Sequence, residues 1–202
     1  MSDVLPRVSI RARTREILRE QIVDRAVTLF REQGYDAVTV EQIASTVGMS
    51  RRTLHRYFAS KDDIVLEHFD LLAEVFAERL RSRPSEEDTW ESLRHTFVAS
   101  SDGADDEASR RNSDIAQIVS ASSGLIAGSL ERTQRAQGLL ADVLRERAEQ
   151  RGQRIDRNDP TFDAVVAAAC ACRNVAVTVS ASTGVSLADA LTVTMGAVRP
   201  SA

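Results

Sequence analysis

The sequence predicts an all-α protein, with an N-terminal three-helix domain that contains a helix-turn-helix and a larger helical domain behind it. Three observations carry this prediction. Apolar residues recur at spacings of three and four along most of the 202 residues, which is the period of a helix face. Glycine and proline are scarce, at nine and four residues, and they mostly punctuate the periodic stretches. Ser, Thr or Asp precedes most stretches, where such side chains cap helices.

Residues 39–61 predict two short helices joined by a tight turn. Apolar side chains recur on one face of residues 40–47, and Gly48 can adopt the left-handed backbone that ends a helix. Ser50 can then cap a second helix, residues 51–58, whose apolar residues share one side and whose basic residues occupy the others. A short basic helix held by a partner helix fits the major groove of DNA. The segment is therefore predicted to be a helix-turn-helix.

The residues before this segment supply its support. Residues 14–33 carry a helical apolar stripe that ends at Gly34, so we expect a supporting helix before the helix-turn-helix. The helix-turn-helix of residues 39–61 is called the reader below. Together these elements define a DNA-binding domain at residues 13–60. Residues 1–12 have no apolar period, and we expect either a disordered tail or a flexible basic arm that reaches into a minor groove.

Charge is distributed unevenly along the chain. The net charge of −4 argues against nucleic-acid binding, but residues 1–61 carry 11 Arg and Lys against 7 Asp and Glu, a net of +4. Residues 62–202 carry 15 against 23, a net of −8. A basic front and an acidic remainder are typical of a DNA-reading module attached to a domain that does not touch DNA.

Residues 61–202 predict a second, wholly helical domain. The expected helices and breaks are a long helix at 61–83, a helix from about 85 to 100, an acidic loop at 101–108, helices from 115 to 151 with an interruption at 122–124, a polar segment at 153–159, and helices at 160–182 and 186–199. The long helix follows the reader without a linker, so movement at its far end would tilt the reader.

The last two segments are rich in Ala, Val, Cys and Ser. Their local alternation also fits a strand, but no pairing partner is nearby and the flanking residues 159–172 are helical in pattern. Small residues on several faces let a helix pack closely against several neighbours. We expect residues 160–199 to form a homodimer interface, with an ordinary intrachain core as the alternative.

Several classes of protein are disfavoured. No signal peptide or transmembrane helix is visible, because the most apolar run, residues 164–172, is short and ends at Arg173. A cytoplasmic protein is therefore expected. The three histidines are scattered, so we expect no metal site and no cofactor. The sequence shows no nucleophile elbow, phosphate loop or plausible triad, and we expect no enzyme.

The two cysteines, Cys170 and Cys172, do not form a disulfide framework. On a helix they point about 200° apart, which disfavours a bond between them. A buried structural role is expected, and a disulfide between subunits that senses redox state is the alternative.

Residues 13–65 resemble the DNA-binding domain of TetR/AcrR-family transcriptional regulators. The matching residues are Ala26, Leu29, Phe30, Gly34, Thr39, Val40, Ile43, Ala44, Gly48, Met49, Ser50, Thr53, Leu54, Tyr57, Phe58 and Lys61. The match covers about a quarter of the chain without a gap. One departure is His55, where the family more commonly carries a tyrosine that touches a phosphate. Histidine can also donate to a phosphate, so a DNA-facing role is still expected there.

The reader's residue types suggest separate roles. Arg51 and Arg52 lie in the first turn of the recognition helix, where arginine can grip guanine bidentately, and they are expected to contact bases. Thr53, His55 and Tyr57 would contact the DNA backbone or thymine methyl groups. Thr39 and Lys61, near helix N-termini, would contact phosphates. Arg56 completes the predicted DNA-binding set. For any single arginine the alternative is a solvated charge without a contact.

The resemblance also implies a ligand cavity among the middle helices, within residues 64–152. The candidate lining residues are Phe69, Phe76, Trp90, Phe97 and Ile118, and the alternative for each is a plain core position. Few charges fall inside these apolar stripes, which favours an apolar or aromatic effector. The leading hypothesis is a homodimeric repressor released from a palindromic operator by a small molecule. The alternative is a constitutive DNA-binding regulator or activator without an effector.

Overall fold

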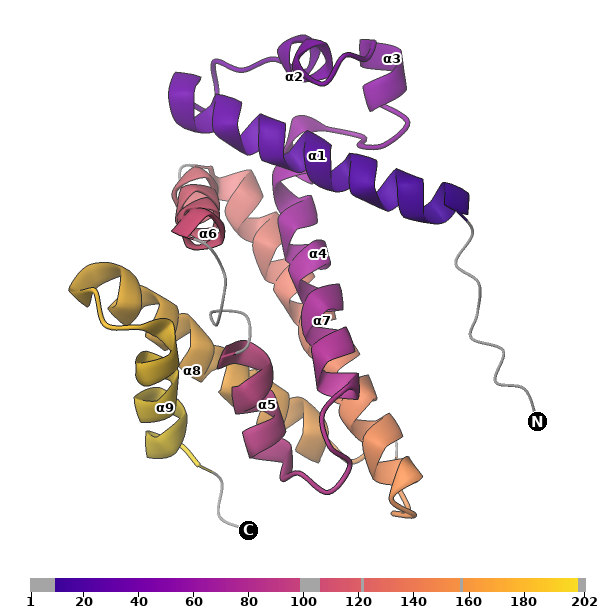
Figure 1. Ribbon diagram of the computed structural model, residues 1–202, viewed down its shortest axis with the longest axis vertical. Coiled ribbons are helices and arrows are strands. Elements are labelled where there is room, and N and C mark those ends of the chain that lie inside the picture. The colour runs from indigo at the N-terminus through magenta and orange to yellow at the C-terminus, as the bar shows by residue number, and fades with distance from the viewer. Residues whose placement is uncertain (1–9, 99–105, 121, 157, 200–202) are drawn as a thin grey trace. The chain divides into compact units, whose positions relative to one another are not determined.

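The computed structural model describes residues 10–98, 106–120, 122–156 and 158–199, and these contain helices and no strand (Figure 1). The prediction of an all-α fold is confirmed, and the strand alternative for the last two segments is wrong. The helices of the described residues are α1 (Ile10–Gln33), α2 (Val40–Thr46), α3 (Arg51–Leu54), α4 (Lys61–Arg81), α5 (Thr89–Val98), α6 (Asp106–Ser120), α7 (Ser123–Gln150), α8 (Thr161–Thr183) and α9 (Leu187–Ala197).

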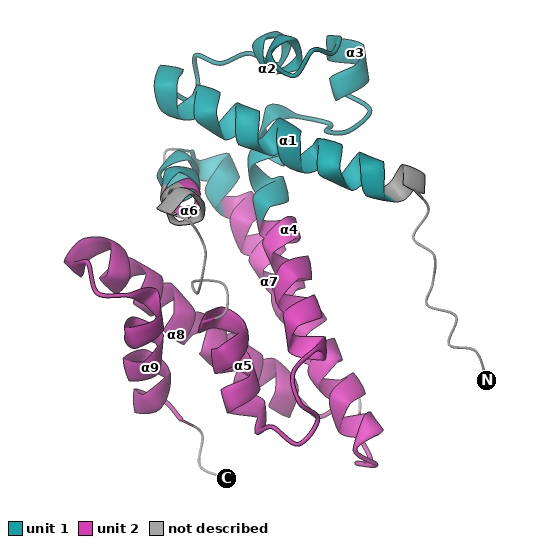
Figure 2. Ribbon diagram, in the orientation of Figure 1, with its two compact units in different colours: residues 1–68, 114–126 teal, residues 69–113, 127–202 magenta. Residues whose placement is uncertain are grey.

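The chain forms two compact units (Figure 2). Unit 1 comprises residues 1–68 and 114–126, and unit 2 comprises residues 69–113 and 127–202. Helices α4, α6 and α7 contribute residues to both units. The predicted division at residues 60 and 61 concerns function, and it stays a prediction.

Unit 1 is built on α1, and α2 and α3 lie next to each other along one side of it (Figure 1). The stripe predicted on α1 is buried, with Ile22 and Ala26 fully enclosed and Phe30 at 2% exposure. Gly34 follows α1 with φ 86°, a left-handed conformation in which a side chain would be strained. The chain can therefore turn directly into α2.

Some element boundaries differ from the expectation. The start of α1 at Ile10 makes the last three residues of the predicted arm helical, while residues 1–9 lie outside the described part. Helix α6 starts at Asp106, so residues 106–108 of the predicted acidic loop are helical and residues 101–105 are not described. Helix α5 starts only at Thr89, because the Asp88 carboxylate accepts the backbone N–H of Trp90 at 3.0 Å and caps the helix there.

The core of unit 2 is formed by α4, α5, α7, α8 and α9. Its largest fully enclosed side chains include Leu80, Leu93, Phe97, Leu140, Leu191 and Met195. The indole N–H of Trp90 donates to the Met195 carbonyl at 3.1 Å, so α5 and α9 are joined by a hydrogen bond as well as by packing.

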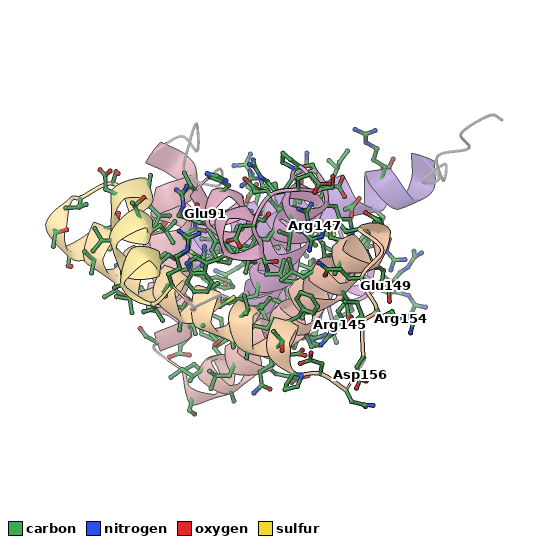
Figure 3. All side chains as sticks on the ribbon, turned by 90° about the horizontal axis from the view of Figure 1, so that it is seen from below. Glu91, Arg145, Arg147, Glu149, Arg154 and Asp156 are labelled. Carbon is green, nitrogen blue, oxygen red and sulfur yellow. The ribbon has the colours of Figure 1, made fainter. Side chains whose placement is uncertain are left out.

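Arg147 of α7 closes the end of α4. Its guanidinium donates to the backbone carbonyls of Leu80, Arg83 and Pro84 at 3.0, 2.7 and 2.8 Å. The Arg147 side chain is buried, whereas Glu149, two residues further along the same helix, is exposed; both are labelled in Figure 3. The carbonyls lie at and just after the C-terminus of α4, where the negative end of the helix dipole stabilises a buried cation.

Helix α8 corrects one expectation. By length and composition it is long and apolar enough to cross a membrane, although no such helix was expected. The reason is that the helix continues past Arg173 to Thr183, so its apolar stretch is much longer than residues 164–172. One face of α8, with Val166, Ala169 and Ala176, packs into the core of unit 2. A helix that packs in a protein core can have the same length and apolar composition as one that crosses a membrane.

Candidate nucleic-acid interface

The two helices of the reader are both capped as their sequences predict. At α2 the backbone N–H of Gln42 donates to Thr39 Oγ1 at 3.2 Å, and the Gln42 side chain accepts the Thr39 N–H at 2.7 Å. This reciprocal pair is a capping box. At α3 the Thr53 N–H donates to Ser50 Oγ at 3.1 Å. Both N-termini are therefore fixed by their own side chains.

The turn between the helices is fixed by the backbone. Gly48 has φ 69°, and the Met49 N–H donates to the Ala44 carbonyl at 2.9 Å. Helix α3 itself is only four residues long, so the predicted helix over residues 51–58 is too long. The chain tightens after Leu54, because Arg56 and Tyr57 donate their backbone N–H groups three residues back instead of four.

Helix α3 and the turn after it separate an apolar side from a polar side. Leu54 is 1% exposed and Phe58 is 4% exposed, so both face the core of unit 1. The exposed side carries Arg51, Arg52, His55 and Arg56, and Thr53 and Tyr57 are half-buried at its edge. The structure therefore gathers six of the eight predicted DNA-binding residues on and directly after one short helix.

Arg51 and Arg52 differ in their surroundings. Arg51 pairs with Glu41 of α2 at 2.6 Å, and its Nε donates to His55 Nε2 at 3.3 Å. Arg52 is exposed and has no hydrogen-bond or ion-pair partner among the described residues. An exposed ion pair is worth little in water, so Glu41 orients Arg51 more than it restrains it. Arg52 presents all its donors to an approaching ligand.

Lys61 and Tyr57 contact the backbone and rings of unit 1. Lys61 Nζ donates to the carbonyls of Tyr35 and Val38 at 2.7 and 3.1 Å and lies 4.2 Å from the Tyr35 ring centre. Two of the three ammonium N–H donors are thus engaged. The Tyr57 ring lies under the Arg15 guanidinium at 5.6 Å. Both residues hold the loops of the reader in place.

An ion pair joins α1 to α4, with the Glu67 carboxylate buried and Arg19 half-buried. The Arg19 guanidinium donates Nε and Nη2 to the two oxygens of Glu67, each at 2.5 Å, and Nη1 to the Tyr57 carbonyl at 3.1 Å. The same guanidinium lies 4.7 Å from the Phe58 ring centre. The Glu67 hydrogen bonds raise the pKa of Arg19 above its usual value. One side chain thus ties together the supporting helix, the end of the reader and the start of α4.

The predicted ligand-pocket residues are divided between the two units, and their role stays a prediction. Trp90 borders a cleft of about 300 Å³ in unit 2, together with Arg94, Thr192 and Arg199. Ile118 borders a cleft of about 220 Å³ in unit 1. Phe76 and Phe97 are packed into the core of unit 2, edge to face at 5.1 Å, and Phe69 is half-buried. Among the described residues no group of His, Cys, Asp or Glu could hold a metal ion.

The contact of Arg173 with aromatic rings in unit 2 was not predicted. Arg173, in the middle of α8, lies with its guanidinium 4.9 Å from the Phe76 ring centre and 5.9 Å from that of Phe97. Arg19 and Glu67 were also missed. The signal for Arg173 was available, because it is the one basic residue between positions 161 and 183. The Arg19–Glu67 pair joins residues 48 positions apart, which periodicity cannot connect.

The cysteines are free thiols in unit 2, with Cys172 buried and Cys170 half-buried. Burial raises the pKa of the Cys170 thiol to about 11 and also raises the pKa of Cys172. A thiol with a raised pKa is a weak nucleophile at neutral pH. This favours the structural role over redox sensing.

Comparison with known proteins supports the interpretation of unit 1. Residues 22–68 match the family described as bacterial regulatory proteins, tetR family. The HTH-type transcriptional regulator TcmR of Streptomyces glaucescens is 32% identical over 149 residues, which cover 68% of this chain and 63% of TcmR. The negative transcriptional regulator IcaR of the biofilm operon icaADBC in Staphylococcus aureus is 40% identical over 47 residues, 23% of this chain and 25% of IcaR. The chain thus spans less than two thirds of the length of these curated relatives.

A similar fold over most of the chain is also found in solved structures. The TetR-family transcriptional repressor FadR of Thermus thermophilus, solved in complex with lauroyl-CoA, has a TM-score of 0.54. The superposition covers 88% of this chain and 91% of FadR at 23% sequence identity, which is evidence for the fold alone. With the capped helix-turn-helix, its exposed basic side and these likenesses, the chain belongs to the TetR family of bacterial regulatory proteins.

Proposed function

We propose that the protein is a cytoplasmic, homodimeric transcriptional repressor that binds a palindromic operator and is released from it by a small-molecule ligand. The observation that carries the DNA-binding part is the exposed basic side of α3. There Arg51 and Arg52 project from the first turn of a helix whose other side, at Leu54, is buried. The first turn of a recognition helix is the part that reaches base edges.

The proposed contacts divide into two kinds. Arg51 and Arg52 would read bases, each bidentate contact with guanine contributing about 1–3 kcal/mol of discrimination. The remaining members of the set would position the reader on the sugar-phosphate backbone and are Thr39, Thr53, His55, Arg56, Tyr57 and Lys61. Thr39 lies at the N-terminus of α2, where the helix dipole favours an anion. Lys61 has one free donor for the same purpose.

The outer faces of α8 and α9 support the proposed dimer. Small or apolar residues are exposed at helical spacing along α8, at Ala164, Ala167, Ala171 and Val175, and on α9 Val193 is 71% exposed. The two helices pack against each other in unit 2. An exposed apolar face on a pair of helices is covered at low cost by a second copy of the same pair. Two copies would present two readers to a two-fold symmetric operator.

A constitutive regulator without an effector is the second candidate. The packing of Phe76 and Phe97 favours it, because these predicted pocket residues fill the core of unit 2. Lauroyl-CoA in the Thermus FadR complex supports ligand control only by analogy of fold. A cavity that opens on binding would reconcile a filled core with ligand control.

The proposed function is tested by operator binding of matched variants. Arg51→Ala and Arg52→Ala should each weaken binding to a specific operator at least about fivefold while leaving non-specific affinity within a few-fold. Arg25→Ala, exposed on α1 outside the reader, is the control and should bind as the wild type does. Binding should also fall steeply with salt, because several phosphates are neutralised. Unchanged specific affinity in both reader variants would overturn the assignment. Sedimentation as a monomer at micromolar concentration would overturn the dimer.

A further inference from the structure

Arg173 is the one basic residue of α8, and it lies in the middle of the helix. The helix's one acidic residue, Asp163, lies in its first turn and pairs with Arg145 of α7. Arg173 therefore lacks a charged partner on its own helix. Arg173 is half-buried, and a cation drawn into the interior of a protein is normally paired.

The guanidinium of Arg173 rests on aromatic rings from two other helices. It lies 4.9 Å from the ring centre of Phe76 on α4 and 5.9 Å from that of Phe97 on α5. Cation–π contact offsets part of the cost of burial, but it uses the face of the guanidinium and does not satisfy the N–H donors at its edge. Arg173 Nε is fully enclosed and has no hydrogen-bond partner.

No anion of unit 2 compensates this charge among the residues that the structure describes. The ionisable group that acts on it electrostatically is Cys170, one helical turn away. Burial raises the pKa of that thiol to about 11, so it is neutral at pH 7. Burial also lowers the pKa of the Arg173 guanidinium, but the side chain stays charged. By contrast, Arg145 pairs with two carboxylates and Arg147 donates to three carbonyls.

We propose that Arg173 anchors an acidic group of the effector. The ligand class is then an apolar, aromatic or aliphatic body that carries a carboxylate, sulfonate or comparable anion. Phe76 and Phe97 would contact the body, and the unused edge of the guanidinium would receive the anion. This inference rests on the proposed ligand control, and it adds an anionic group to the apolar or aromatic effector that the sequence favours.

Two fluorescent probes that share an anilinonaphthalene body test the inference directly, without DNA. One is the anion 8-anilinonaphthalene-1-sulfonate, and the other is neutral N-phenyl-1-naphthylamine. The wild-type protein should bind the anion about tenfold more tightly than the neutral probe, as one charge-assisted contact predicts. Arg173→Met should remove this preference and leave the affinity for the neutral probe within about twofold. Arg173→Lys should keep part of the preference, because it keeps the charge.

Arg135→Met is the matched control, because Arg135 is a largely exposed arginine of α7 in the same unit. It removes the same formal charge and should leave both affinities unchanged. An anion preference that survives Arg173→Met, or that is lost equally in Arg135→Met, would overturn the proposal. Failure of both probes to bind the wild type would also overturn it, since no ligand site would then accompany the arginine.

The thermal midpoint of the ligand-free protein separates the proposed role from a structural one. Arg173→Met removes an uncompensated, half-buried charge, so its midpoint should equal or exceed that of the wild type. A fall of about 5 °C or more would show that Arg173 is structural, and would overturn the inference.

Operator release distinguishes this inference from the proposed function. If an anion binds through Arg173 but the protein stays on its operator, ligand control is refuted and the anion site is supported. If only neutral aromatic compounds release the protein from its operator, and Arg173→Met does not change that release, the anion site is refuted and ligand control is supported.

Discussion

The ion pair between Arg19 and Glu67 makes an asymmetric prediction about stability. The Glu67 side chain is 9% exposed, whereas that of Arg19 is 29% exposed. Arg19→Met therefore strands a buried carboxylate and should destabilise the protein by about 3–5 kcal/mol. In Glu67→Leu the Arg19 guanidinium can reach water and keep its hydrogen bond to the Tyr57 carbonyl. This change should therefore lower the free energy of unfolding by only about 1–2 kcal/mol.

The double variant Arg19→Met/Glu67→Leu gives the sharper result. It replaces both charges by apolar groups, so its stability should lie within about 1.5 kcal/mol of the wild type, closer than that of Arg19→Met alone. The coupling between the two changes should be about 2 kcal/mol or more. Urea unfolding followed by circular dichroism measures all four proteins.

The control for this cycle is Arg25→Met, on the exposed side of the same helix, which should change stability by no more than about 0.5 kcal/mol. The reasoning is refuted if Arg19→Met costs no more than Arg25→Met, or if the two single effects simply add in the double variant.

Three further predictions concern other parts of the chain. Thr39→Ala removes one half of the α2 capping box and should cost about 1 kcal/mol in urea unfolding, and Thr39→Ser, which keeps the acceptor, should recover most of it. Hydrogen bonds, chiefly from Arg83, hold the pKa of Glu87 at about 2, below its ordinary value of 4.5. The stabilisation by the Glu87 carboxylate is therefore complete above about pH 4.5 and is lost as pH falls toward 2. Glu87→Gln should destabilise the protein at pH 6 and much less at pH 3. An equal loss of stability at both pH values would contradict the pairing. Mild oxidant should produce no Cys170-dependent dimer on a non-reducing gel, because the thiol pKa is about 11; a dimer abolished by Cys170→Ser would restore the redox alternative.

The architecture of the reader follows from its sequence because its determinants are local. Leu54 and Phe58 recur four residues apart and are buried, and Thr39 and Ser50 cap the helices that they precede. Each of these features depends on residues within about one helical turn. The length of α3 was missed, because the switch to bonds three residues apart after Leu54 has no signature in composition.

Features that depend on distant residues were not predicted. Arg147 meets the end of α4 across more than 60 positions, and neither pattern nor spacing links them. Arg173 interrupts an apolar helix, and this was interpreted as the end of the apolar stretch. The structure shows instead that the helix continues and that the arginine turns onto Phe76. A charge inside an apolar helix thus marked a candidate site, not a boundary.

The central claim is that two copies of the basic reader recognise a two-fold symmetric DNA sequence. Selection of bound duplexes from a random DNA library by the full-length protein, followed by sequencing, tests it most directly. Two readers in one dimer should enrich an inverted repeat whose half-sites lie on one face of the duplex, with a base preference in each half-site that Arg52→Ala relaxes. Enrichment of no sequence, or of a single half-site without a symmetric partner, would contradict it.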